Sequence, residues 1–151
     1  MKKYLKILAV ALLAAFAASC VKTNDDVLYS IKVEPTADQF AGSPSSDAKK
    51  TYNDIKSKLN DFEKSYNQTW TEKVSDKDFS AADRNAKSAY DKALAAFQDL
   101  ESSAKTAVAA LPTDGVHDSF LISRTIKLSR FDGESSGNTI AEYTMTLTFN
   151  R

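Results

Sequence analysis

Three stretches of the chain alternate apolar and polar residues with a period of two, the pattern of a β-strand with one buried face. The first covers residues 27–34 and ends before Pro35. The other two cover residues 120–129 and 141–149 and flank a turn predicted over residues 132–138. Their second faces are rich in serine and threonine, as expected for an antiparallel sheet with one face in water. The pattern therefore predicts three strands, of which the last two form a β-hairpin.

Two stretches between the first and second strands carry apolar residues three and four positions apart, which is the spacing of an amphipathic helix. After a polar linker over residues 36–46, the first helix is predicted to begin near Pro44, with Ser43 or a nearby serine as its N-cap. Its apolar stripe consists of Tyr52, Ile55, Leu59, Phe62 and Tyr66, with Trp70 one turn further. The second helix is predicted over residues 80–111, and its stripe is rich in alanine. Ser80 and Asp83 resemble a shortened capping box at its start.

The order of these elements predicts an α+β fold of the type β-α-α-β-β. Aromatic residues of the first helix are expected to fill the shallow, alanine-rich stripe of the second, so that the two form an antiparallel helical hairpin. This hairpin is predicted to pack on one face of a three-stranded, mostly antiparallel sheet, whose strand order the pattern leaves open. One charge departs from the pattern, because Arg124 shares the face of Ile122 and Ile126. Either it extends to water at the rim of the sheet or a β-bulge resets the alternation, and we favour the rim.

The start of the chain has the features of an export signal. Lys2, Lys3 and Lys6 precede an uncharged run over residues 7–18, and small residues follow it. The run has about 12 residues, whereas a membrane-spanning helix needs roughly 20. A basic start, a short apolar core and small residues at the cleavage site predict a secretory signal peptide.

The stretch Ala17-Ala18-Ser19-Cys20 resembles the lipobox of bacterial lipoproteins, although Ala17 stands where that motif usually has Leu. The resemblance covers the export signal alone and implies that Cys20 becomes the lipidated first residue of the mature protein. Cleavage after Ala17, which would release a soluble protein, is the alternative. Val21 is not the Asp that retains many lipoproteins in the inner membrane, so the resemblance implies the outer membrane, with its periplasmic or surface face undetermined. The predicted organisation is a signal peptide over residues 1–19, a lipidated cysteine and polar tether over 20–26, and one α+β domain over 27–151.

Composition narrows the range of functions. Removal of the three leader lysines leaves 17 basic and 20 acidic residues, a formal charge of −3, which is no basic footprint for nucleic acid. The chain has one histidine, His117, and no cysteine besides Cys20, so no metal site and no cofactor are predicted. His117, Asp118 and Ser119 are adjacent in sequence, and adjacent residues of a strand point to opposite faces instead of converging as in a catalytic triad. No catalytic residue is predicted.

The hydroxyl-rich face of the predicted hairpin is the candidate binding surface for an envelope protein or a glycan. Its residues are Ser123, Thr125, Ser129, Thr144, Thr146 and Thr148, with Leu121, Phe131 and Ile140 beside them. The leading hypothesis is a lipid-anchored, non-catalytic binding or structural module of the cell envelope. The alternatives are a periplasmic or surface enzyme, or an inhibitor that binds the edge of a partner's sheet, acting on an envelope component. A deep pocket that joins His117 to two carboxylates would favour the enzyme, and an exposed strand edge without protecting charges would favour the inhibitor.

The lipidation hypothesis is tested directly by Cys20→Ala. This change should abolish incorporation of labelled fatty acid and leave an unprocessed or soluble form, because the lipid would be carried on the Cys20 sulfur. Metabolic labelling and fractionation of membranes measure both effects. A free Cys20 thiol in the mature wild-type protein would overturn the hypothesis.

Overall fold

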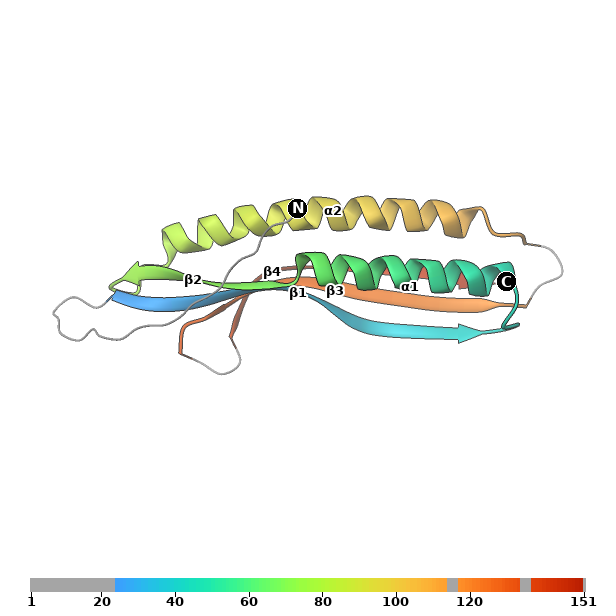
Figure 1. Cartoon of the computed structure of the whole chain (residues 1–151), viewed down its shortest axis with the longest axis horizontal. Helices are drawn as coiled ribbons and strands as arrows, with labels where there is room; N and C mark the ends of the chain where they lie inside the picture. Colours follow the sequence, from blue (N-terminus) through green and yellow to red (C-terminus); the bar gives the residue numbers. More distant parts are fainter. Residues whose placement is uncertain (1–23, 114–116, 134–136, 151) are drawn as a thin grey trace.

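A computed structural model of the chain describes residues 24–113, 117–133 and 137–150, and the predicted leader and Cys20 lie outside these ranges. Two helices cover one face of a four-stranded antiparallel sheet with the strand order β2-β1-β3-β4 (Figure 1). The elements are β1 (Asn24–Ala41), α1 (Asp47–Tyr66), β2 (Gln68–Ser75), α2 (Ser80–Ala109), β3 (Ser119–Phe131) and β4 (Asn138–Asn150). The predicted α+β class and antiparallel sheet are confirmed, with one strand more than predicted.

β1 continues through Pro35, so the predicted end of the first strand is wrong. The backbone N–H of Val33 donates to the side chain of Asn67 at 2.9 Å, and it therefore points away from β3. In an antiparallel ladder, the backbone N–H groups of every second residue point to the same side. A backbone N–H at position 35 would therefore also point away from β3, and proline has no such group. β2 pairs with β1 only as far as Ile31, and position 35 therefore lies where that side of β1 has no neighbouring strand. Proline is tolerated in a strand at such a position.

A β-bulge directly follows this proline. The register of β1 against β3 shifts between Pro35 and Ala37, which leaves Thr36 as an extra residue. One extra residue exchanges the two faces of a strand, so Asp38 and Phe40 lie on the face that the helices cover. The ring of Phe40 lies 5.4 Å from that of Tyr52 in α1. The predicted linker thus supplies a second half of β1 that packs against the first helix.

α1 begins as predicted but ends earlier. Ser46 is its N-cap, and its side chain accepts a hydrogen bond from the Lys49 N–H at 3.1 Å. The helix stops at Tyr66, and Trp70, predicted on its stripe, lies in β2 and stacks on Tyr29 at 5.7 Å. β2 was missed because an aromatic residue four positions after Tyr66 fits a helical spacing as well as a strand.

α2 lies antiparallel to α1, and β2 connects the two helices in place of the short loop of a hairpin (Figure 1). The predicted capping box at its start is wrong. Ser80 is the first helical residue, and its N–H donates to the carboxylate of Asp78 at 3.1 Å. Asp83 is turned toward the sheet, where it accepts a hydrogen bond from the Tyr29 hydroxyl at 2.7 Å.

The core lies between the helices and the sheet. α1 packs against β1 and β3, whereas α2 packs against β4, β3 and β2. The largest fully buried side chains are Tyr29, Tyr90, Phe97, Ile31, Leu59, Ile122, Ile126, Leu128, Met145 and Val27. Small residues of α2, among them Ala86 and Ala93, are also buried, which lets the helix approach its neighbours closely.

Ala93→Phe should destabilise the protein by about 1–3 kcal/mol, because overpacking a well-packed core costs this much. Ala93 is 1% exposed, and urea unfolding measures the free energy of unfolding. Lys92→Ala, an exposed change on the same helix, is the control and should stay within about 0.5 kcal/mol of wild type. Equal stabilities of the two variants would contradict the packing described here.

Candidate functional site

The predicted binding face lies on the side of the sheet that neither helix covers (Figure 1). Its residues differ in exposure. Thr144, Thr146 and Thr148 of β4 are exposed, whereas Ser123, Thr125 and Ser129 of β3 are at most 9% exposed. The expectation that all six hydroxyls face water is therefore wrong for β3, because that strand is flanked by side chains of both neighbouring strands.

The hydroxyls of β3 and β4 pair with one another. Thr125 lies opposite Thr144, and their hydroxyl oxygens are 2.7 Å apart. Ser123 lies opposite Thr146, with 3.4 Å between the two oxygens. These cross-strand pairs satisfy the buried hydroxyls of β3, and the exposed threonines of β4 keep further hydrogen-bonding capacity toward the outside. The result is an uncharged, polar strip along the outer side of the sheet.

A row of charges crosses the same face and separates Ser129 from the other hydroxyls. Lys127 of β3 lies opposite Lys32 on β1 and opposite Glu142 on β4. Its ammonium lies 3.5 Å from the carboxylate of Glu34. The structure therefore brings five of the six predicted residues into one strip and places Ser129 beyond the charges.

Arg124 lies inside the protein, so the predicted position at the rim is wrong. Its side chain is 4% exposed and binds the carboxylate of Asp38 through two hydrogen bonds of 2.6 and 3.0 Å. Lys56 of α1 approaches the same carboxylate at 3.8 Å. The bulge at Thr36 makes this pair, because it turns Asp38 to the face on which Arg124 lies. Sequence reasoning named the bulge as an alternative but sought it on the arginine's own strand.

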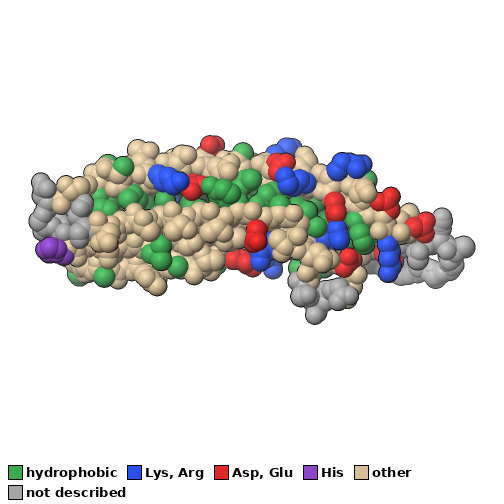
Figure 2. Space-filling model, turned by 180° about the vertical axis from the view of Figure 1, so that it is seen from behind, with side chains coloured by type: hydrophobic (Ala, Val, Ile, Leu, Met, Phe, Trp, Pro, Cys, Tyr) green, Lys and Arg blue, Asp and Glu red, His purple; other side chains and the backbone are tan. Residues whose placement is uncertain are grey.

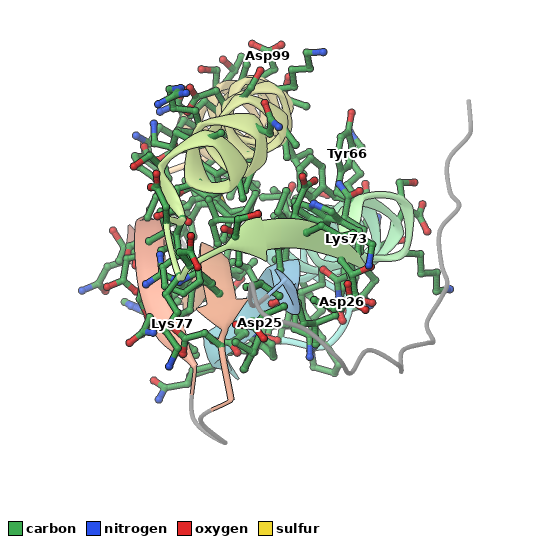
Figure 3. All side chains as sticks on the ribbon, turned by 90° about the vertical axis from the view of Figure 1, so that its left-hand side faces the viewer. Asp25, Asp26, Tyr66, Lys73, Lys77 and Asp99 are labelled. Atoms are coloured by element: carbon green, nitrogen blue, oxygen red, sulfur yellow. The ribbon has the colours of Figure 1, made fainter. Side chains whose placement is uncertain are left out.

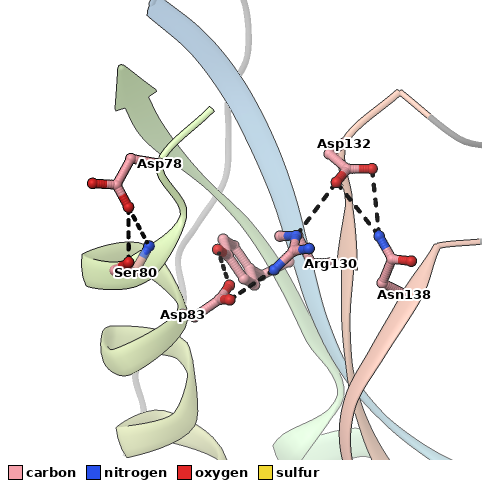
Figure 4. Close-up of polar contacts among 7 residues, drawn as sticks. Asp78, Ser80, Asp83, Arg130, Asp132 and Asn138 are labelled. Carbon is pink, nitrogen blue, oxygen red and sulfur yellow. Dashed lines mark hydrogen bonds and ion pairs between the residues drawn. The ribbon is translucent and has the colours of Figure 1, made fainter. Parts of the chain in front are cut away.

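A second polar network fixes α2 to the sheet at the end where β1 begins, the Asn24 end (Figure 4). The carboxylate of Asp83 accepts hydrogen bonds from the Tyr29 hydroxyl and from the Arg130 guanidinium, each at 2.7 Å. Arg130 also lies 3.5 Å from Asp132 and above the ring of Phe79 at 4.2 Å. Burial, together with the hydrogen bond to Asp83, raises the pKa of Tyr29 above its ordinary value, so this hydroxyl stays protonated as a donor.

A cleft borders this network. It is open, has a volume of about 560 Å³ and is lined by Asp25, Asp26, Val27, Lys77, Phe79, Asp132 and Gly133. Figure 3 shows the Asn24 end with Asp25, Asp26, Lys73 and Lys77 around it. The Lys73 ammonium binds the Asp26 carboxylate at 2.9 Å and the Arg130 guanidinium lies 3.5 Å from Asp132, so two of the three acidic groups of the cleft are already paired.

His117 and Asp118 lie at the opposite end, the His117 end. His117 is exposed, whereas Asp118 is 2% exposed and accepts a hydrogen bond from the Ser43 N–H at 2.9 Å. A Cβ at Gly42 would collide with this carboxylate, so only glycine fits beside it. A cavity of about 270 Å³ near the start of α1 is lined by Asp118 but not by His117. The structure therefore does not join His117 to a pair of carboxylates.

Within the described residues, no cluster of three or more His, Cys, Asp or Glu side chains has the arrangement of a metal site. The helices described are also too short or too polar to cross a membrane. No family model, curated protein or solved structure matches the chain. The function must therefore be argued from the geometry of the chain itself.

Sequence reasoning missed Glu101. It is 7% exposed on the stripe of α2 and accepts a hydrogen bond from the Tyr143 hydroxyl at 2.6 Å, which raises the pKa of that tyrosine. Lys105, one turn further, binds the same carboxylate at 3.1 Å. The signal was present in the sequence, because Glu101 stands four positions after Phe97 and three before Ala104 on an otherwise apolar stripe.

Asp38→Ala should destabilise the protein by about 3 kcal/mol, because removing the half-buried carboxylate leaves the buried Arg124 guanidinium uncompensated. Unfolding in urea measures the loss. Asp91→Ala is the matched control, since it removes an exposed pair with Lys87 on the surface of α2 and should cost no more than about 0.5 kcal/mol. A difference of less than about 1 kcal/mol between the variants would mean that the pair does not stabilise the fold.

Proposed function

We propose that the chain is a lipoprotein anchored in the outer membrane through Cys20, and that its domain is a non-catalytic binding or structural module of the cell envelope. The observation that carries the proposal is the one-sided architecture. Both helices cover the same face of the sheet, and the opposite face bears a strip of threonine hydroxyls that is open over the described residues. A flat, uncharged and hydroxyl-rich surface is suited to hydrogen bonding with an envelope protein or a glycan.

The position of the domain on its tether supports an envelope role. β1 begins at Asn24, four residues after Cys20, and four residues reach at most about 14 Å. Anchoring at Cys20 therefore holds the Asn24 end close to the membrane. The sheet, whose longest strand has 18 residues, would extend up to roughly 60 Å along its length.

The buried and half-buried carboxylates support a non-catalytic role, because each is used to hold the fold. Asp38 binds Arg124, Asp83 binds Tyr29 and Arg130, and Glu101 binds Tyr143 and Lys105. A general acid or base needs a carboxylate or histidine that faces a substrate pocket and is available for proton transfer. The enzyme alternative would have to use the cleft at the Asn24 end or the smaller cavity lined by Asp118, and His117 lines neither of them.

The paired change Thr146→Val and Thr148→Val tests the binding face. Valine keeps the shape and strand preference of threonine but removes the two exposed hydroxyls. The variant should still fold, with a loss of about 1 kcal/mol of stability because the buried Ser123 hydroxyl loses its partner on Thr146. Capture of a specific partner or glycan from detergent-solubilised envelopes should weaken roughly tenfold or more, because each lost hydrogen bond is worth about 1 kcal/mol.

Thr71→Val is the matched control, because Thr71 is exposed on β2 at the other edge of the same sheet. Mass spectrometry and glycan analysis of the captured material compare wild type with both variants. Capture that is equal in all three proteins would show that the threonine strip of β4 is not the binding surface.

A further inference from the structure

Over the described residues, the chain protects two of its exposed strand edges and leaves a third without a neighbouring strand. β2, at one side of the sheet, has only eight residues and carries Glu72 and Lys73. The part of β1 beyond β2 carries Pro35 and a bulge, and Asn67 binds its Val33 N–H. Short length, charges, proline and bulges are the means by which proteins prevent a strand edge from pairing with another chain.

β4, at the other side of the sheet, has one of these protections over residues 141–148, the charge of Glu142, and lacks the others. This segment contains no proline or glycine, its register against β3 is regular, and Glu142 is its one charged residue. Apart from Glu142, its exposed residues are threonines, which favour the extended conformation. Figure 2 shows the molecule from behind, with the histidine in purple at one end. The half of the molecule nearer to this end carries fewer charged side chains in this view than the other half.

The pairing pattern shows which backbone groups of β4 are open. Because the Val33 N–H points away from β3, the opposite residue Ile126 directs its N–H and C=O to β4, where Tyr143 lies opposite it. Tyr143 and every second residue from it therefore pair with β3. The intervening residues direct their N–H and C=O away from the sheet, and in the regular part of β4 these are Glu142, Thr144, Thr146 and Thr148.

The backbone groups of β2 alternate in the same way at the other edge of the sheet. Thr69, Thr71 and Lys73 of β2 direct their backbone groups away from β1. The hydrogen bond from the Asp78 N–H to the Ser75 C=O at 3.0 Å agrees with this, because Ser75 belongs to the same alternation and its carbonyl is used outside the sheet. The two edges therefore offer matched positions for substitution.

We propose that the open edge of β4 pairs antiparallel with β4 of a second copy of this chain, which joins two sheets into one of eight strands. The pattern of β4 is complementary to itself. Two-fold pairing places the helix-side residues Tyr143, Met145 and Leu147 beside the same set in the partner, and threonines beside threonines.

The single charge of the segment also fits this arrangement. Glu142 lies toward one end of residues 141–148, so an antiparallel partner places the two glutamates on opposite sides of the two-fold axis. A parallel partner in register would place them side by side, where like charges repel.

Pairing with a second copy also agrees with the small number of large hydrophobic side chains that are exposed. Leu28 on β1 is the one large hydrophobic residue among the described residues that is exposed, so the surface offers no broad apolar patch for a bulky partner. Main-chain pairing along an edge needs no such patch. The dimer would also double the width of the threonine strip, since the two β4 strands would lie next to each other.

Light scattering and sedimentation of the full-length protein in detergent should give a mass of two chains per particle after correction for detergent. Thr146→Pro should reduce this to one chain while the protein stays folded, because proline removes an N–H that points away from β3 and is tolerated at a strand edge. Thr71→Pro, the matched change on β2, should remain dimeric. Thr146→Val should also remain dimeric, because it removes the hydroxyl alone, and it thereby separates self-association from the capture of other partners.

Hydrogen exchange followed by NMR provides a second test that needs no variant. The amides of Glu142, Thr144, Thr146 and Thr148 should exchange more slowly as the protein concentration rises, whereas those of Thr69, Thr71 and Lys73 should not change. A wild-type protein that stays monomeric up to roughly 0.1 mM, a concentration that populates complexes with a Kd in that range, would overturn the proposal. So would a dimer that persists in a folded Thr146→Pro variant, or protection that appears on β2 instead of β4.

Discussion

One extra residue in β1, Thr36, determines how the two halves of this protein are joined. Without the bulge, Asp38 and Phe40 would lie on the outer face of the sheet, and Arg124 would be buried opposite a proline without a carboxylate. With it, Asp38 forms two hydrogen bonds to Arg124, and Phe40 reaches Tyr52 of α1. The bulge therefore attaches α1 to the longest strand. It also supplies the carboxylate that neutralises Arg124, which is almost fully buried on the helix-covered face.

Polar networks play the same part at both ends of the sheet. At the Asn24 end, Asp83 joins the start of α2 to Tyr29 on β1 and to Arg130 on β3. Toward the other end, the pair of Arg124 with Asp38 joins β3 to β1, and Lys56 brings in α1. A buried charge is costly unless it is paired and hydrogen-bonded, so these contacts specify one arrangement of helices on the sheet. Over the residues that the structure describes, the outer face has no such contacts to a third layer.

The uncovered face and the outer edge of the sheet meet on β4, so this strand would serve both of the proposed contacts. Its odd-numbered residues from Tyr143 to Phe149 pack under α2, while its threonines point outward. Because side chains alternate and backbone groups alternate with them, the same threonines carry the exposed hydroxyls and the outward N–H and C=O groups. A partner on the face and a second copy at the edge would therefore contact the same residues through different atoms.

Periodicity in the sequence determined most of the fold. The period-two pattern of β3 and β4 and, apart from Trp70, the stripes of both helices were predicted correctly, because apolar spacing follows directly from the face that each element buries. The six hydroxyl residues were predicted as one face for the same reason. Tertiary structure decided what depends on neighbours in space. Pro35 is accommodated because β2 ends before it, Trp70 joins a strand because β1 offers it an edge, and Thr125 is buried because two strands flank it. Arg124 finds its partner through a bulge in a different strand, 86 residues away in sequence, and no local pattern around the arginine contains that information.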